Sequence, residues 1–134
     1  MVHEVFVICD GANDSQGKLN ILGAFDSIIA QEFPFVHPHC VFVLRLRIDH
    51  NDGRESAIRL ILRHAAEETV LASVDTTLKH DSFPNPTMSA NLIVNINALR
   101  FEKPGDYAFT LEINGMPAAI APLYVRQAKS GSIH

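Results

Sequence analysis

The sequence of 134 residues contains no tryptophan and only two cysteines, Cys9 and Cys40. Two thiols cannot supply the disulfide framework of small secreted domains, and a chain of this length buries enough surface to fold without metals or disulfides. No apolar stretch is long enough to span a membrane. The run Val5–Cys9 is too short for a signal peptide and follows no basic segment. We therefore expect a cytoplasmic protein with two reduced, buried thiols and no membrane contact.

The chain also lacks an excess of positive charge and the short motifs of common enzymes. Its formal net charge is -4, which gives no general attraction to nucleic acid. It has no Gly-x-Ser-x-Gly elbow and no glycine-rich phosphate loop. We accordingly predict no catalytic residues, no cofactor and no nucleic-acid partner.

Helical apolar periodicity is absent, whereas short alternating runs between turn residues recur along the chain. They predict strands at residues 4–9, 18–25, 40–50, 54–64, 70–78, 87–99 and 107–113, and one more after Asn114-Gly115. The expected fold class is all-β, a single antiparallel β-sandwich of about eight strands that is immunoglobulin-like in broad architecture. The β-sandwich domain would cover residues 1–128, with residues 129–134 as a flexible C-terminal tail.

The clearest alternation runs from Cys40 to His50, with apolar residues at even positions and Arg45 and Arg47 at odd positions. A second strand follows "HNDGR", residues 50–54. We predict a hairpin with a three-residue loop in which Gly53 adopts the left-handed conformation. In that register Leu46 lies opposite Ile58 and Leu44 lies opposite Leu60, so both apolar sets face the core.

Two further features refine the β prediction. Asn114-Gly115 is a strong hairpin signal, and the strand after it contains Pro117 and Pro122, so it should lie at an edge or carry a bulge. In "LRFEKPGDYAF", residues 99–109, Tyr107 opens a strand after a Pro-Gly corner. A tyrosine there ties its hydroxyl to the backbone in immunoglobulin-like sandwiches. The alternative is an ordinary β-turn with an incidental tyrosine.

The segment "CDGANDSQGKLNILGAFDSIIAQEFPFVHP", residues 9–38, carries a resemblance. Its order of a short strand, an acidic turn, Gly-Lys-Leu and Leu-Gly-Ala-Phe-Asp resembles the opening of a family of small bacterial proteins of unknown function. "PGDY" and "PLYV" near the end are similar to the same family's ending. The resemblance implies a bacterial β-sandwich and gives no catalytic residues. Gly17 and Gly23 have structural explanations in backbone freedom or close approach.

"VHPHC", residues 36–40, places His37, His39 and Cys40 close together. On an extended strand His37 and His39 would share one face while Cys40 points to the other, so the three cannot chelate one ion. The histidine pair could supply two ligands, but zinc needs at least three from the protein. We expect no metal site. His37 and His39 remain the candidates for one.

The outer face of the predicted hairpin is the best candidate for a functional surface. The hairpin register sets Arg45 opposite Arg59, and like charges directly opposite destabilise a sheet. Nearby Asp49 and Glu55 could relieve them, or an anionic partner could. Apolar and arginine residues together are typical of interface cores. The predicted interaction face comprises Val41, Val43, Arg45, Arg47, Arg59, Ile61 and Arg63.

Three hypotheses follow. The first is a non-catalytic interaction or structural module that forms a homo-oligomer. The second is a binding protein for a small anion or an acidic protein, through the arginines. The third is a metal-dependent enzyme that uses His37 and His39. An ordinary charged solvent face is the alternative to the first two.

Overall fold

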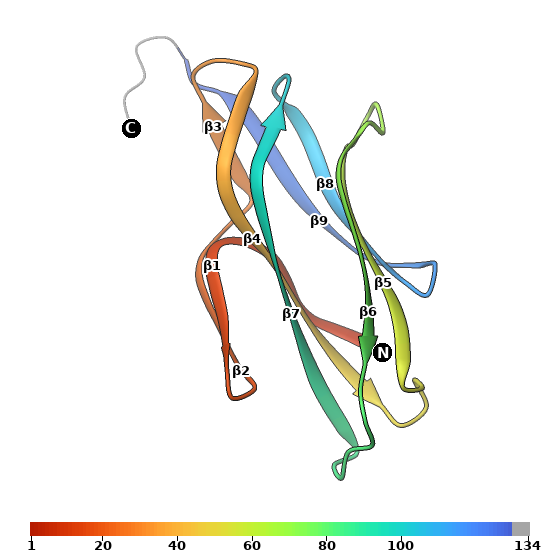
Figure 1. The fold of residues 1–134 in the computed structure, drawn as a ribbon. Helices are drawn as coiled ribbons and strands as arrows, with labels where there is room; N and C mark the ends of the chain where they lie inside the picture. Colours follow the sequence, from red (N-terminus) through yellow and green to blue (C-terminus); the bar gives the residue numbers. More distant parts are fainter. Residues whose placement is uncertain (130–134) are drawn as a thin grey trace.

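The computed structural model describes residues 1–129, which form nine strands in two sheets (Figure 1). Sheet A has the order β2 (Lys18–Phe25), β1 (Val2–Ser15), β4 (Phe35–Asp49), β7 (Thr87–Phe101). Sheet B has the order β3 (Ser27–Ala30), β9 (Met116–Gln127), β8 (Gly105–Ile113), β5 (Glu55–His64), β6 (Val70–Lys79). The predicted all-β class is confirmed. Residues 130–134 of the predicted tail lie outside the described residues.

One strand was not predicted and one pairing is not antiparallel. The four-residue strand β3 pairs in parallel with the end of β9, Tyr124–Gln127. Every other strand pair is antiparallel. Among residues 1–129 no helix is long and apolar enough to cross a bilayer.

The main core lies between the two sheets. At its centre the Phe42 ring of β4 contacts Phe6 of β1 and Phe109 of β8, with centroids 4.5 and 4.6 Å apart. All of the predicted inward residues of β4 from Cys40 to Ile48 are buried. Alternation along β4 therefore places them as the sequence indicates.

The predicted hairpin between β4 and β5 is wrong. β4 lies between β1 and β7 in sheet A, while β5 lies between β8 and β6 in sheet B. Gly53 does have the predicted left-handed conformation, with φ +77°, but residues 50–54 carry the chain from one sheet to the other. Leu46 and Ile58 still meet, because they face each other across the core. An apolar set can be buried by a facing sheet as well as by a neighbouring strand.

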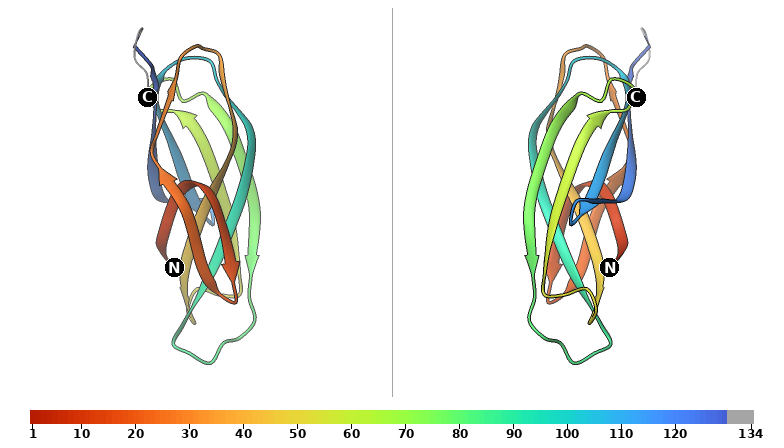
Figure 2. Two further views of the ribbon diagram at one scale, coloured as in Figure 1. Left: turned by 90° about the vertical axis from the view of Figure 1, so that its left-hand side faces the viewer. Right: turned by 90° about the vertical axis from the view of Figure 1, so that its right-hand side faces the viewer.

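Strand β1 belongs to two layers. Its first half pairs with β4, and its second half, from Ile8, pairs with β2. Between them the chain bends, so that residues 9–25, here called the β1–β2 hairpin, lie on the outer side of sheet A (Figures 1 and 2). Gly23 is at φ +68°, and a Cβ on it would lie 2.5 Å from the carboxylate of Asp10. Both the backbone freedom and the close approach expected for this glycine are present.

The proline-containing strand β9 carries the predicted bulge. Its register with β8 shifts between Leu111 and Glu112. β3 pairs with β9 only beyond Pro117 and Pro122, so both prolines lie where β9 has a single partner strand. Asn114 and Gly115, at φ +51° and +79°, form the predicted two-residue turn.

The corner formed by Tyr107 is also present. Its hydroxyl donates to the carbonyl oxygen of Lys103, four residues upstream, over 2.7 Å. The ring is buried against Phe101 and His64, and burial raises the pKa of the Tyr107 phenol. This hydrogen bond links the connection between β7 of sheet A and β8 of sheet B to the start of β8.

We predict that Tyr107→Phe lowers the free energy of unfolding by about 0.5–1.5 kcal/mol, because it removes a partly buried hydrogen bond. Chemical denaturation measures the loss. Tyr124→Phe is the matched control, since Tyr124 lies on the outer face of sheet B with 38% of its surface exposed. Equal midpoints for Tyr107→Phe and the wild type would show that only the ring of Tyr107 matters.

Candidate interaction surface

The outer face of sheet A is covered by the chain itself. Val41 and Val43 of β4 are 2% and 0% exposed. They form a second small core with Cys9, against which Ala12 and Leu19 of the β1–β2 hairpin pack. The two valines predicted to be an exposed interface are therefore buried within one copy of the protein.

The two arginines of this face share one carboxylate. The register of β1 shifts between His3 and Val5, which leaves Glu4 as the extra residue of a bulge. Its carboxylate lies 2.8 Å from Nε of Arg47 and 3.3 Å from Nε of Arg45. The hydrogen bond from Arg47 is the main reason that the pKa of Glu4 is lowered.

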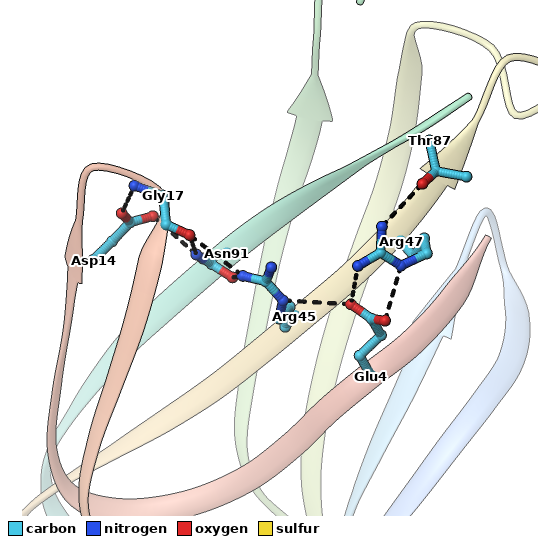
Figure 3. A network of polar contacts seen from close by, with 7 residues as sticks. All are labelled: Glu4, Asp14, Gly17, Arg45, Arg47, Thr87 and Asn91. Atoms are coloured by element: carbon cyan, nitrogen blue, oxygen red, sulfur yellow. Dashed lines mark hydrogen bonds and ion pairs between the residues drawn. The ribbon is translucent and has the colours of Figure 1, made fainter. Parts of the chain in front are cut away.

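Asn91 of β7 connects this ion pair network to the turn of the β1–β2 hairpin (Figure 3). Its Oδ1 accepts from Nη1 of Arg45 over 2.9 Å, and its Nδ2 donates to Oδ2 of Asp14 over 3.0 Å. The carbonyl oxygen of Gly17 lies 3.4 Å from the same Nδ2. Three segments far apart in sequence are thereby joined over the outer face of sheet A. We call this set of contacts the Asn91 clamp.

The predicted interaction face is thus divided between two sides of the molecule. Val41, Val43, Arg45 and Arg47 lie on the outer side of sheet A, whereas Arg59, Ile61 and Arg63 lie on the outer side of sheet B. Arg45 lies beside Asn91 and Val5, and Arg59 lies between Asp75 and Glu112. The expected Arg45–Arg59 repulsion does not occur, because the two strands are in different sheets.

His37 and His39 do not share a face. The His37 ring packs near Phe25 and Phe35, which line the main core. His39 instead contacts Oδ1 of Asn95 over 3.2 Å on the outer side. The alternation breaks here because Ala98, between the partners of the two histidines, has a φ of +55°. Within residues 1–129 no group of three or more histidine, cysteine or acidic residues is placed to hold a metal ion.

The two cysteines are free and buried, as predicted. Cys9 lies in the small outer core and Cys40 in the main core, so their side chains project from opposite faces of sheet A and cannot form a disulfide. Burial raises the pKa of Cys40 to about 11 and also raises that of Cys9. Both are therefore poor nucleophiles at neutral pH.

Strands of sheet B face the viewer in Figure 2 (right). Their outward residues form rows across neighbouring strands. The Arg63 row contains Val70, Arg63, Ala108 and Pro122. The central row contains Ser73, Ile61, Thr110 and Ile120. The Arg59 row contains Asp75, Arg59, Glu112 and Pro117. Ile120 is 72% exposed, and Tyr124 projects next to the Arg63 row. Apolar, tyrosine and arginine residues are enriched in this way at protein interfaces.

Arg63 differs from the other arginines that lie within the strands. Its Nε is buried and has no hydrogen-bond partner among the described residues. Arg45, Arg47, Arg59, Arg100 and Arg126 each pair with a carboxylate, whereas within residues 1–129 neither Arg63 nor Glu112 takes part in an ion pair. Arg63 is therefore the one arginine of this face that has no carboxylate partner among residues 1–129.

The predicted interaction face included Arg63 and Ile61 of this side, of which Ile61 is only 7% exposed, and it left out the residues of β8 and β9. The signal was present in "IAPLYV", residues 120–125, where Leu123 and Val125 are buried and Ile120, Pro122 and Tyr124 alternate with them outward. Pro117 and Pro122 predicted an edge strand or a bulge, and the outward alternation of residues 120–125 was not predicted. Glu4 gave no signal, because a bulge of one residue is not visible in the apolar pattern.

The sequence matches the model of one protein family. Residues 4–126 match the family of unknown function DUF6941. The chain belongs to this family. The predicted membership of a family without assigned function is confirmed, and DUF6941 has no described activity that could be compared with the surface above.

The other comparisons do not indicate a function. No curated protein matches the sequence. A solved structure, an alkylpurine DNA glycosylase AlkC from Pseudomonas fluorescens bound to DNA containing an abasic site analog, is similar at 11% identity with a TM-score of 0.46. The similarity covers 75% of this DUF6941 chain and 28% of the glycosylase chain. No inference is drawn from a similarity at this level.

We predict that Asn91→Ala loosens the β1–β2 hairpin without unfolding the sheets, because it removes the contacts to Asp14 and Gly17. Both are exposed hydrogen bonds from one amide nitrogen, and together they contribute about 0.5–1.5 kcal/mol. Hydrogen–deuterium exchange in residues 11–22 should become roughly three- to tenfold faster, by the conversion of about 1.4 kcal/mol per factor of ten. Exchange in β8 should not change.

Asn97→Ala is the control, since Asn97 is on the same strand, is exposed and lies outside the Asn91 clamp. Equal exchange in residues 11–22 for Asn91→Ala and Asn97→Ala would mean that apolar packing alone holds the hairpin.

Proposed function

We propose that this protein is a non-catalytic interaction module with an immunoglobulin-like β-sandwich fold, and that it self-associates through the outer face of sheet B. The observation that carries the proposal is the difference between the two outer faces. Val41 and Val43, on the outer face of sheet A, are covered by the β1–β2 hairpin, although Leu22 of that hairpin is itself 74% exposed, whereas Ile120 and Tyr124 on the outer face of sheet B have no covering layer.

Strand order supports the immunoglobulin-like assignment. Neighbours β9, β8 and β5 correspond to strands G, F and C of that fold, and β1, β4 and β7 correspond to A, B and E. Phe42 and Phe109 contact each other where antibody domains join strands B and F by a disulfide. The hydrogen bond of Tyr107 also matches the tyrosine corner of these domains.

The chemistry of the side chains supports a non-catalytic role. Activated nucleophiles have a lowered pKa or an adjacent base, but the pKa of both cysteines is raised by burial. Burial lowers the pKa of His37, and His64 uses its Nδ1 to accept the backbone N–H groups of Ala66 and Glu67. These groups are engaged in structure. The metal-enzyme hypothesis loses its support because His37 and His39 lie on different sides of β4.

Binding of an acidic partner is the second candidate function. It is favoured by one observation, the unpartnered Nε of Arg63. Arg45 and Arg47 support it less, because both already pair with Glu4 and donate to Asn91 and Thr87. One available guanidinium makes a weaker anion site than the predicted stripe of four.

We predict that the wild-type protein is a dimer or larger oligomer at tens of micromolar, and that Ile120→Glu reduces it to a monomer. A buried carboxylate without a partner opposes association strongly. Size exclusion coupled to light scattering gives the mass. Leu22→Glu is the matched control, because Leu22 is 74% exposed on β2 in sheet A, and it should leave the oligomer intact.

A wild-type monomer under these conditions would contradict self-association and move the acidic-partner function ahead. An oligomer disrupted by Leu22→Glu and unaffected by Ile120→Glu would place the interface on sheet A.

A further inference from the structure

We propose that the partner is a second copy of this chain in one defined orientation, with the Arg63 row of each copy over the Arg59 row of the other. The inference rests on the proposed self-association and specifies its geometry. It assigns Arg63 and Glu112 as the two groups that fix the register between copies.

The charges of the rows are complementary. Asp75 and Glu112 flank Arg59 on the neighbouring strands, so the Arg59 row carries two negative charges and one positive charge. Arg63 is the one charged member of its row. The rows thus have net charges of opposite sign, and complementary potentials of this kind set the register of an interface.

These charges cannot satisfy each other within one copy. Arg63 lies opposite Ala108, four residues along β8 from Glu112, which is roughly 13 Å at 3.3 Å per residue. Arg59 is already engaged with Asp75 at 2.7 Å. Arg63 and Glu112 therefore remain unpaired until another surface brings them together.

A two-fold axis brings Arg63 and Glu112 of different copies together. If the axis lies in the interface plane and runs along the central row, it exchanges the two outer rows between copies. Arg63 of each copy then lies over the middle of the other copy's Arg59 row, where Asp75 and Glu112 stand one strand away on either side within reach of its long side chain, and the contact occurs twice, as in every isologous interface. The central row lies on the axis, so Ile120 of one copy meets Ile120 of the other.

The face is large enough for such a contact. Four strands about 4.8 Å apart and nine residues at about 3.3 Å each give a flat area of roughly 600 Å². The accessible surface of side chains exceeds the flat area, and specific interfaces bury about 800 Å² per partner. Val70, which is 54% exposed at one end of the Arg63 row, extends the apolar area.

Charge reversal tests this geometry. Arg63→Glu and Glu112→Arg should each weaken self-association at least tenfold, measured by sedimentation equilibrium, because each places like charges together. Combining the two substitutions in one chain should restore the affinity to within about threefold of the wild type. Mixing the two single variants should produce a heterodimer, because both cross-contacts then join opposite charges. Arg100→Glu, on sheet A, is the control that should change nothing.

Circular dichroism of each variant separates lost association from lost folding. Single variants that associate like the wild type would overturn the geometry while leaving self-association intact. Folded single variants that fail to associate, and that neither the mixture nor the double variant rescues, would overturn it as well. A monomeric wild type would overturn both this inference and the proposed function.

Discussion

The contact between Phe42 of sheet A and Phe109 of sheet B is the interaction on which the rest of the structure depends. Both rings are almost completely buried, and Phe6 extends the cluster within sheet A. Because β4 and β5 each turn one face toward this shared core, their opposite faces must point away from each other. Every assignment of outward residues in this protein follows from that constraint.

The outer faces of the two sheets differ in whether another part of the chain covers them. Sheet A has a third layer, the β1–β2 hairpin, which covers Val41 and Val43; full burial of a valine contributes about 1.5–3 kcal/mol. The Asn91 clamp and the Glu4 bulge satisfy the polar groups at the margin of this layer. Sheet B has Ile120 and Tyr124 at its surface and Arg63 without an acceptor. A face with this composition gains more from a partner than the closed face does.

The sequence was sufficient to predict eight of the nine strands, most of their inward residues, the Asn114-Gly115 turn and the hydrogen bond of Tyr107; Val70, expected to face inward, is 54% exposed. These depend on alternation and on local turn chemistry, which are visible in a short window. Alternation does not say which sheet a strand joins, so the β4–β5 connection was misassigned and the arginines were grouped on one face. Strand β3 has too few residues to show a period. The break at Ala98, which separates His37 from His39, depends on a backbone angle that alanine rarely adopts.

The difference between the two outer faces can be measured most directly by hydroxyl-radical footprinting of the wild-type protein over a range of concentrations. The account predicts that Ile120 and Tyr124 are labelled strongly at low concentration and become protected as concentration rises. Leu22 should be labelled equally throughout, and Val41 and Val43 should stay protected at every concentration. Labelling of Val41 and Val43 in dilute folded protein, with constant labelling of Ile120 and Tyr124, would contradict it.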